Sequence, residues 1–369
     1  MKFGIFHELS VGKPWRADSE SEVYHNALAQ VELADRLGFD QSWAVEHHFL
    51  EEYSHCSAPE VFLAAAAART ERIRLGHGVM MVLPPFNHPA RCAERAAALD
   101  IISKGRLEFG TGRSATWTEL GGFRCEPDLT KEMWDEAVRA IPRMWMQERF
   151  SHEGKFFSMP ERPVIPKPYQ KPHPPMWVAV SSPETAIQAA ERGIGCLGVS
   201  IGTPGEYEAR VKDYRRVIKD CDPVGAFVNE QVNGVTFLYV DETDEEAQLW
   251  GTKLAYSFSH LAAHLIGIST VYPTPAYKTP GLLFGLRAPA GGEKAPGGGG
   301  VIREGMGIGS PETVIKNLKM WEEIGVDRMV FILNTAEVIP QEKVLRSMEL
   351  FAEHVLPVLD KSARRSSAV

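Results

Sequence analysis

The sequence predicts an α/β fold: a (β/α)8 TIM barrel with an insertion after its seventh strand–helix unit. Short β-branched or apolar runs alternate with helical patterns along the chain. Repeated strand–helix units require parallel pairing, because each crossover takes a helix's length of chain, and eight such units close as a barrel. The alternative is an open sheet that binds a dinucleotide. That fold needs a Gly-x-Gly-x-x-Gly turn after the first strand, and His7-Glu8-Leu9-Ser10 does not supply one.

Each element is predicted from its own residues. Strands are expected at residues 2–7, 41–46, 74–83, 106–112, 176–180, 195–200, 232–240 and 326–333. Helices are expected at residues 20–37, 57–70, 89–102, 130–146, 183–192, 203–219, 244–266, 310–323 and 344–355. Apolar residues recur at helical spacing in these segments. Capping boxes, Ser57 with Glu60 and Thr203 with Glu206, predict where two of the helices begin.

Two segments do not fit the repeat. Residues 150–175 are rich in proline and are expected to open with a hairpin. Residues 272–309 are long and rich in Gly and Pro, and loops beyond about 12–15 residues in compact domains are usually functional lids or disorder. We expect a mobile lid over the barrel mouth, with a disordered insertion as the alternative. Residues 1–360 are predicted to form one domain, and 361–369 a disordered tail.

Composition excludes several classes of partner. The 369 residues carry a net charge of −8 with no basic stripe, which argues against nucleic acid or an anionic membrane as partner. No apolar run is long enough to span a bilayer, and the N-terminus lacks a signal-peptide layout. The five cysteines are scattered, which is typical of reduced thiols in a cytoplasmic protein.

A histidine pair follows the second predicted strand, at the barrel end where active sites lie. Adjacent residues leaving a strand point opposite ways, so only one of His47 and His48 can face the mouth. That imidazole either transfers protons or makes a structural hydrogen bond, and the residues alone favour neither. A metal site is the weaker interpretation, because adjacent histidines are poor co-ligands and His260 and His264 lack a third ligand.

An anion site is predicted where the fifth strand meets its helix. The Ser182-Pro183 start exposes backbone N–H groups at a positive helix end. Hydroxyls of Ser181, Ser182 and Thr185 add donors, and Arg113 can reach from the neighbouring strand with a bidentate contact. The alternative is that Ser182 only caps its helix and Arg113 pairs with a carboxylate.

Several blocks of sequence, taken together, resemble the bacterial luciferase-like flavin-dependent monooxygenase family. They are Trp43-Ala44-Val45-Glu46-His47-His48-Phe49, Val82-Leu83-Pro84 with His88-Pro89, and Leu99-Asp100-x-x-Ser103-Lys104-Gly105-Arg106-x-x-Phe109-Gly110. The resemblance covers most of the chain. Members of this family bind reduced FMN at the barrel mouth, react it with oxygen and oxygenate an organic substrate through a peroxyflavin.

The resemblance implies roles for particular residues. Arg113 would hold the FMN phosphate with Ser181 and Ser182, and His47 would assist the oxygen chemistry. Val79 and Met80 would lie behind the isoalloxazine, where luciferases carry a non-prolyl cis peptide. The reactive cysteine that precedes the phosphate arginine in luciferase is Gly112 here, so a long-chain aldehyde substrate and light emission are not implied.

The sequence therefore predicts an oxygenase that receives FMNH2 from a separate NAD(P)H:flavin reductase and uses O2 on a small, apolar organic substrate. A homodimer is expected from the same resemblance. Two alternatives remain at this point: hydride transfer with a deazaflavin, which relatives on this barrel use, and a flavin-binding protein without catalytic activity.

Overall fold

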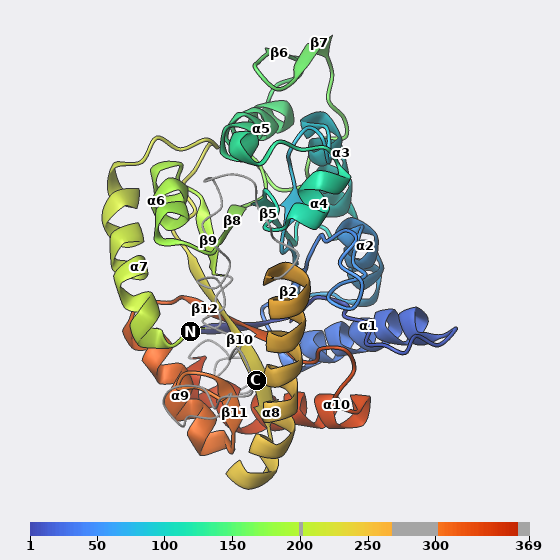
Figure 1. Cartoon of the computed structure of the whole chain (residues 1–369). Helices are drawn as coiled ribbons and strands as arrows, with labels where there is room; N and C mark the ends of the chain where they lie inside the picture. The colour runs from blue at the N-terminus through green and yellow to red at the C-terminus, as the bar shows by residue number, and fades with distance from the viewer. Residues whose placement is uncertain (199–201, 268–301, 361–369) are drawn as a thin grey trace.

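Parallel strands close into a barrel surrounded by helices, as the sequence predicted (Figure 1). The computed structural model describes residues 1–198, 202–267 and 302–360. The barrel strands are β1 (Lys2–His7), β2 (Gln41–Ala44), β3 (Arg74–His77), β5 (Leu107–Gly112), β8 (Met176–Val180), β9 (Gly195–Gly198), β10 (Val232–Val240) and β12 (Arg328–Ile332). They pair in this order, and β12 returns to β1. Every pair is parallel, so all the carboxyl ends meet at one rim.

Helices follow most of these strands and pack around the barrel. They are α1 (Ser19–Leu37), α2 (Pro59–Arg69), α3 (Pro89–Ile102), α4 (Trp117–Gly122), α5 (Thr130–Met146), α6 (Pro183–Glu191), α7 (Pro204–Val217), α8 (Asp244–Leu261), α9 (Pro311–Glu323), α10 (Gln341–Leu350) and α11 (Leu356–Leu359). The predicted hairpin is present as β6 (Phe150–Glu153) and β7 (Ser158–Arg162), which stand away from the barrel at the top of Figure 1. None of the helices in the described ranges is both long and apolar enough to cross a bilayer.

Local sequence explains where several helices begin or end. Gly38 ends α1 with a φ of 91°, a left-handed conformation that glycine adopts without strain. The side chain of Ser182 accepts the N–H of Thr185 at the start of α6. The predicted capping box of Thr203 and Glu206 opens α7.

The capping box predicted at Ser57 was wrong. The residue that caps α2 is Ala58, and no side chain bonds to the free amides there. Glu60 instead pairs with Arg95 of α3 at 2.8 Å. The Glu60 carboxylate, which the local pattern assigned to the helix cap, therefore binds a charged partner that is distant in the sequence.

The predicted strand at 74–83 is interrupted. β3 ends at His77, a cis peptide joins Gly78 to Val79, and a short strand β4 (Met80–Met81) then pairs with β5. The segment 272–309, expected to be a lid, ends in a strand, β11 (Gly307–Gly309), which pairs with β10. Residues 272–301 of the predicted lid and the tail at 361–369 lie outside the described residues.

Candidate active site

A cavity at the carboxyl ends of the strands brings together residues that are far apart in sequence. It is lined by Glu8 after β1, His47 after β2, Val79 after β3, Arg113 after β5 and Ser181 after β8. Its empty space, counted together with its open mouth, is about 1080 Å³. This is the rim where barrel enzymes place their chemistry.

Five of the predicted site residues line this cavity and two do not. The five are His47, Val79, Arg113, Ser181 and Thr185. Met80 is fully buried outside the lining, and its neighbour Met81 lines the cavity instead. Ser182 is the N-cap of α6, where its Oγ lies 3.3 Å from the Thr185 amide and 3.1 Å from the Thr185 hydroxyl.

The donor set at one end of the cavity suits a phosphate monoester. The first turn of α6 supplies the Thr185 hydroxyl, and Ser181 lies directly before the helix. Arg113 enters from the end of β5 and also donates to Thr130 Oγ1 of α5 at 3.1 Å. A helix N-terminus, hydroxyls and a guanidinium are the groups that bind phosphate oxygens in proteins, so these residues fit the phosphate of FMN.

Close packing forms the wall beneath that end. At Gly112 a Cβ atom would lie 2.2 Å from Val79 Cγ2, and at Gly78 it would lie 2.8 Å from the Phe6 ring. Any larger residue at 112 would therefore displace Val79, which follows the cis peptide. This contact gives a physical reason for glycine at the position where luciferase carries cysteine.

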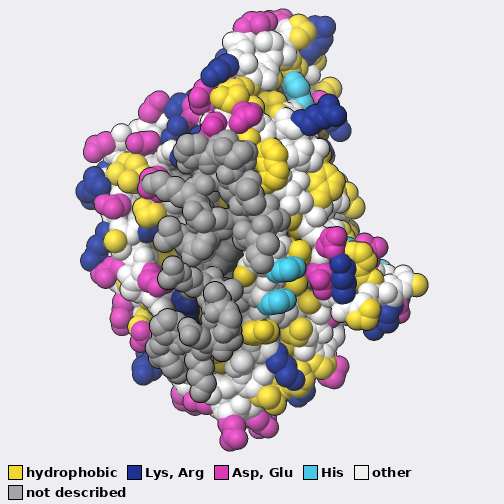
Figure 2. Space-filling model, viewed as in Figure 1, with side chains coloured by type: hydrophobic (Ala, Val, Ile, Leu, Met, Phe, Trp, Pro, Cys, Tyr) yellow, Lys and Arg dark blue, Asp and Glu magenta, His cyan; other side chains and the backbone are white. Residues whose placement is uncertain are grey.

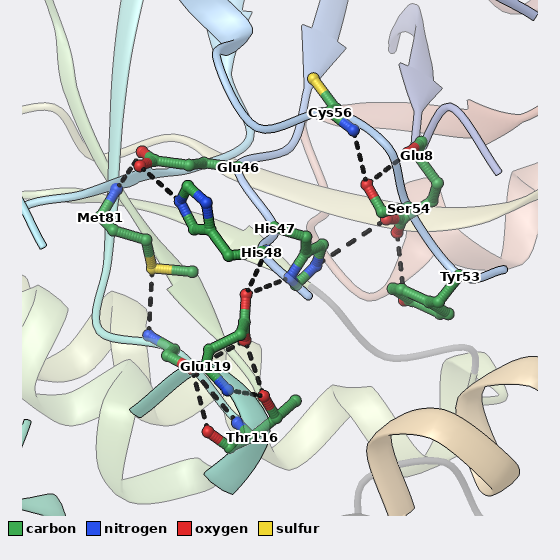
Figure 3. A network of polar contacts seen from close by, with 11 residues as sticks. Glu8, Glu46, His47, His48, Tyr53, Ser54, Cys56, Met81, Thr116 and Glu119 are labelled. Atoms are coloured by element: carbon green, nitrogen blue, oxygen red, sulfur yellow. Dashed lines mark hydrogen bonds and ion pairs between the residues drawn. The ribbon is translucent and has the colours of Figure 1, made fainter. Parts of the chain in front are cut away.

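The imidazole of His47 lies between two buried carboxylates (Figure 3). Its Nδ1 is 3.0 Å from Glu119 Oε1, and its Nε2 is 3.8 Å from Glu8 Oε2. The ring of Tyr53 contacts it edge-on, with centroids 5.4 Å apart. The position of His47 is thus determined from three sides, and its Nε2 faces the cavity side that Glu8 also lines.

Glu119 was not predicted as a site residue. It belongs to α4, a helix of six residues that the sequence analysis did not identify. Its Oε2 accepts hydrogen bonds from Ser114 Oγ at 2.8 Å and Thr116 Oγ1 at 2.9 Å, and its Oε1 also accepts the backbone N–H of His48 at 3.1 Å. A signal was available, since Thr116-x-x-Glu119 is a capping-box pattern and Thr116 does cap α4.

These contacts set the charge of the histidine. Burial alone would lower the pKa of His47, but the adjacent Glu119 carboxylate, and Glu8 and Glu46 beyond it, raise that pKa to about 9. Burial alone would raise the pKa of Glu119, but His47 and the hydroxyl donors hold it below its usual value. At neutral pH the pair is therefore imidazolium and carboxylate, so His47 can donate a proton from Nε2.

His48 turns to the other side of the loop. Its Nε2 is 3.1 Å from Glu46 Oε1, and its ring packs edge-on against Phe123 at 4.9 Å. Glu46 Oε2 in turn accepts the backbone N–H of Met81 at 2.7 Å. His48 therefore contributes to holding the loop after β2, whereas His47 faces the cavity.

The described residues contain no cluster of three or more His, Cys, Asp or Glu side chains arranged to hold a metal ion. The rings of His260 and His264 stack with centroids 5.9 Å apart at the end of α8. The cysteines in the described ranges are free, and all except Cys221 are buried.

Comparison with known proteins identifies the family of this chain. The family model described as luciferase-like monooxygenase matches residues 1–328. The oxygenase component of a flavin-dependent trigonelline monooxygenase from Acinetobacter baylyi is 25% identical over 372 residues, covering 98% of this chain and 96% of that protein. Limonene 1,2-monooxygenase from Rhodococcus erythropolis is 27% identical over 350 residues, covering 93% of this chain and 84% of that protein.

Solved structures share the architecture. The monooxygenase RslO1 from Streptomyces bottropensis has a TM-score of 0.77 at 29% identity, covering 97% of this chain and 99% of that one. A coenzyme F420-dependent tetrahydromethanopterin reductase from Methanopyrus kandleri shares the fold at 19% identity, with a TM-score of 0.68 over 97% of this chain and 99% of that one. The barrel alone thus serves more than one flavin-type cofactor, but the family match spans most of the chain. This protein belongs to the luciferase-like monooxygenases, a family of flavin-dependent oxidoreductases.

Proposed function

We propose that this chain is the oxygenase of a two-component system. It takes FMNH2 from a separate NAD(P)H:flavin reductase and uses O2 to insert one oxygen atom into a small, apolar organic substrate. The observation that carries the proposal is one cavity that joins a phosphate-binding donor set, Arg113 with Ser181 and Thr185, to a protonated imidazole, His47. The relative named as an oxygenase component supports the separate reductase.

His47 and Glu119 have different roles in the reaction. FMNH2, when bound, supplies the two electrons that reduce O2. One oxygen atom enters the substrate and the other leaves as water with two protons, which balance the two that FMNH2 would give up on becoming FMN. His47 donates from Nε2, and Glu119 keeps the ring oriented and charged through Nδ1.

The lining of the cavity favours an apolar substrate. Phe6, Val45, Val178 and Ile266 contribute to its wall, and an apolar wall excludes water from the reacting atoms. Limonene, named for one relative, is a substrate of this kind. Charged side chains of both signs are interspersed around the coloured part of the face shown in Figure 2, so the described surface there offers no single-sign field that would steer a charged substrate.

An isotope experiment tests the reaction. Purified protein is mixed with FMNH2, ¹⁸O2 and each member of a panel of ketones, terpenes, aromatics and aldehydes, and products are analysed by mass spectrometry. We expect one ¹⁸O atom in a substrate-derived product, and FMNH2 consumption without oxygenation when substrate is omitted. Turnover only with reduced deazaflavin would support hydride transfer. Tight FMN binding without turnover would support a binding protein.

We also propose a cytoplasmic homodimer, as the resemblance to this family implies. Light scattering should give twice the 40.9 kDa mass of the chain. A strictly monomeric protein across the accessible concentration range would contradict the dimer and leave the proposed reaction standing.

A further inference from the structure

Glu8 is a buried carboxylate that the mechanism described so far does not use. It follows β1 directly, is 4% exposed and lines the same cavity as His47. Its Oε1 accepts the hydroxyl of Tyr53 at 3.2 Å, and its backbone oxygen accepts Ser54 Oγ at 2.6 Å. The Tyr53 contact positions the carboxylate, and the Ser54 contact positions the backbone of Glu8.

The other carboxylate oxygen of Glu8 has no hydrogen bond among the described residues. It lies 3.8 Å from His47 Nε2, close enough for electrostatic pairing but beyond hydrogen-bond distance (Figure 3). A buried polar atom without a partner is costly. Several other buried side-chain atoms of the described residues also lack a hydrogen-bond partner, but among them only Glu8 Oε2 belongs to a residue that lines this cavity. Its position beside a proton-donating nitrogen indicates a functional reason for the cost.

The two carboxylates beside His47 differ in what they can do. Glu119 accepts from His47 Nδ1, the His48 amide, Ser114 and Thr116. Those donors stabilise its ionised form, so it remains a carboxylate and orients the ring. Glu8 has one donor, Tyr53, and therefore can exist in either protonation state.

We propose that Glu8 is a proton-relay residue that acts through His47. After His47 has donated its Nε2 proton, the Glu8 carboxyl O–H bond breaks and an Nε2–H bond forms. The carboxylate then recovers a proton from water at the open mouth of the cavity, and the pair is ready for the next turnover. This inference rests on the proposed function, because that reaction requires two protons for the oxygen atom that leaves as water.

The electrostatics of the site agree with a relay. Burial raises the pKa of Glu8 to about 7; His47 and the Tyr53 hydrogen bond oppose this rise, and Glu119 adds to it. The titratable groups that face the pair are Glu119, Glu46, Tyr53 and Cys56. Burial raises the pKa values of Tyr53 and Cys56 well above their usual range, so neither titrates near pH 7.

The first test is Glu8→Gln, which keeps the shape and the acceptor for Tyr53 but cannot titrate. We expect product formation in a single turnover to fall by about 10²-fold, the lower end for a group that handles protons, with more peroxide released. The wild-type yield should fall as pH rises through about 7, because the protonated carboxyl is the active form. In Glu8→Gln this decrease of the yield with rising pH, the alkaline limb of the pH profile, should be absent.

Tyr53→Phe provides the matched control. The Tyr53 hydrogen bond lowers the pKa of Glu8, so removing the hydroxyl should move the same limb to higher pH while it remains present. Neither variant touches Arg113 or Ser181, and FMNH2 affinity should stay within about threefold of wild type. A variant that loses activity without any change in the shape of the profile would point to a structural role and overturn the relay.

A titration that needs no activity separates this inference from the proposed function. In flavin-free protein the ¹⁵N resonances of His47, assigned with the His47→Ala variant, should titrate at lower pH in Glu8→Gln, because the Glu8 carboxylate raises the pKa of His47. Unchanged His47 titration and an unchanged pH profile would overturn the relay. Absence of ¹⁸O product from the wild type would overturn the proposed reaction, and the titration would still report whether Glu8 and His47 are coupled.

Discussion

Each end of the barrel contains a buried carboxylate, but the two carboxylates differ in their hydrogen-bond partners. At the amino end Glu108 is 2% exposed, and both of its oxygens have partners: Oε1 accepts Arg74 Nε and Oε2 accepts Trp177 Nε1 at 2.6 Å. Arg328 approaches the same carboxylate at 3.7 Å. At the carboxyl end Glu8 is equally enclosed, yet one of its oxygens faces His47 Nε2 without a hydrogen bond.

This difference distinguishes a carboxylate with a structural role from a carboxylate with a role in proton transfer. The pairing is a property of Glu108 and not of every group at that end, because Arg328 Nη1 and Gln41 Nε2 have no hydrogen bond among the described residues. A carboxylate with both oxygens paired is held rigidly, and residues at the amino end of such barrels serve stability. In a site that changes its protonation state, not every polar group can have a hydrogen-bond partner in both states. We therefore expect substitutions at the amino end to change the free energy of unfolding, and substitutions at the carboxyl end to change activity.

The largest effect is expected at His47. His47→Ala should lower oxygenation by about 10²–10⁴-fold, because a positioned proton donor is lost, while FMNH2 affinity is retained. His48→Ala is the control. Its ring packs on Phe123 and bonds to Glu46, so it should lower the melting temperature more than the rate. Stopped-flow measurements of rate and affinity check this prediction. A large loss of rate in His48→Ala but not in His47→Ala would show that His48 is the imidazole that donates.

Next in size is Glu108→Ala, which removes the buried carboxylate that accepts from Arg74 Nε and from the Trp177 N–H. We expect the free energy of unfolding to fall by about 3–5 kcal/mol, the range for breaking a buried ion pair, as measured by urea denaturation. Glu161→Ala removes an exposed pair with Arg149 and should cost less than about 1 kcal/mol. Equal losses of unfolding free energy in the two variants would contradict the structural role of Glu108.

The stability of Glu8→Gln relative to wild type should depend on pH in a defined direction. Folding raises the pKa of Glu8 from 4.5 to about 7. The stability contributed by the protonated carboxyl is therefore fully present below about pH 4.5 and is lost as pH rises through about 7. Gln lacks this loss, so the variant should gain on wild type between pH 5 and 8 by up to about 3 kcal/mol. A difference that does not vary with pH, followed by thermal unfolding, would contradict the raised pKa.

The smallest effect concerns the phosphate end of the cavity. Arg113→Ala should weaken FMNH2 binding by about 1.5–3 kcal/mol, the value of a hydrogen bond to a charged group. Riboflavin lacks the phosphate and should bind wild type and variant alike, which controls for any disturbance from losing the Thr130 contact. Flavin titrations that show the same affinity for FMNH2 in both proteins would remove Arg113 from the site.

The sequence by itself was sufficient for the barrel and for the general position of its site. Alternating strand and helix patterns predict parallel pairing whatever the neighbours are, and short-range signals such as Ser182-Pro183 and Gly38 act within one turn of a helix. Long, periodic elements were therefore predicted well. The helix α4 was missed because six residues are too few to show a period.

Only the tertiary structure decided which groups meet. His47 and Glu119 are 72 positions apart, and Glu8 reaches them from another strand. The cavity wall contains Met81 in place of the predicted Met80, in the segment where β3 ends and the short strand β4 begins. The charge on His47 is likewise a property of its enclosure, because burial and three carboxylates act on its pKa together. Two of those carboxylates, Glu8 and Glu119, are distant from His47 in the sequence.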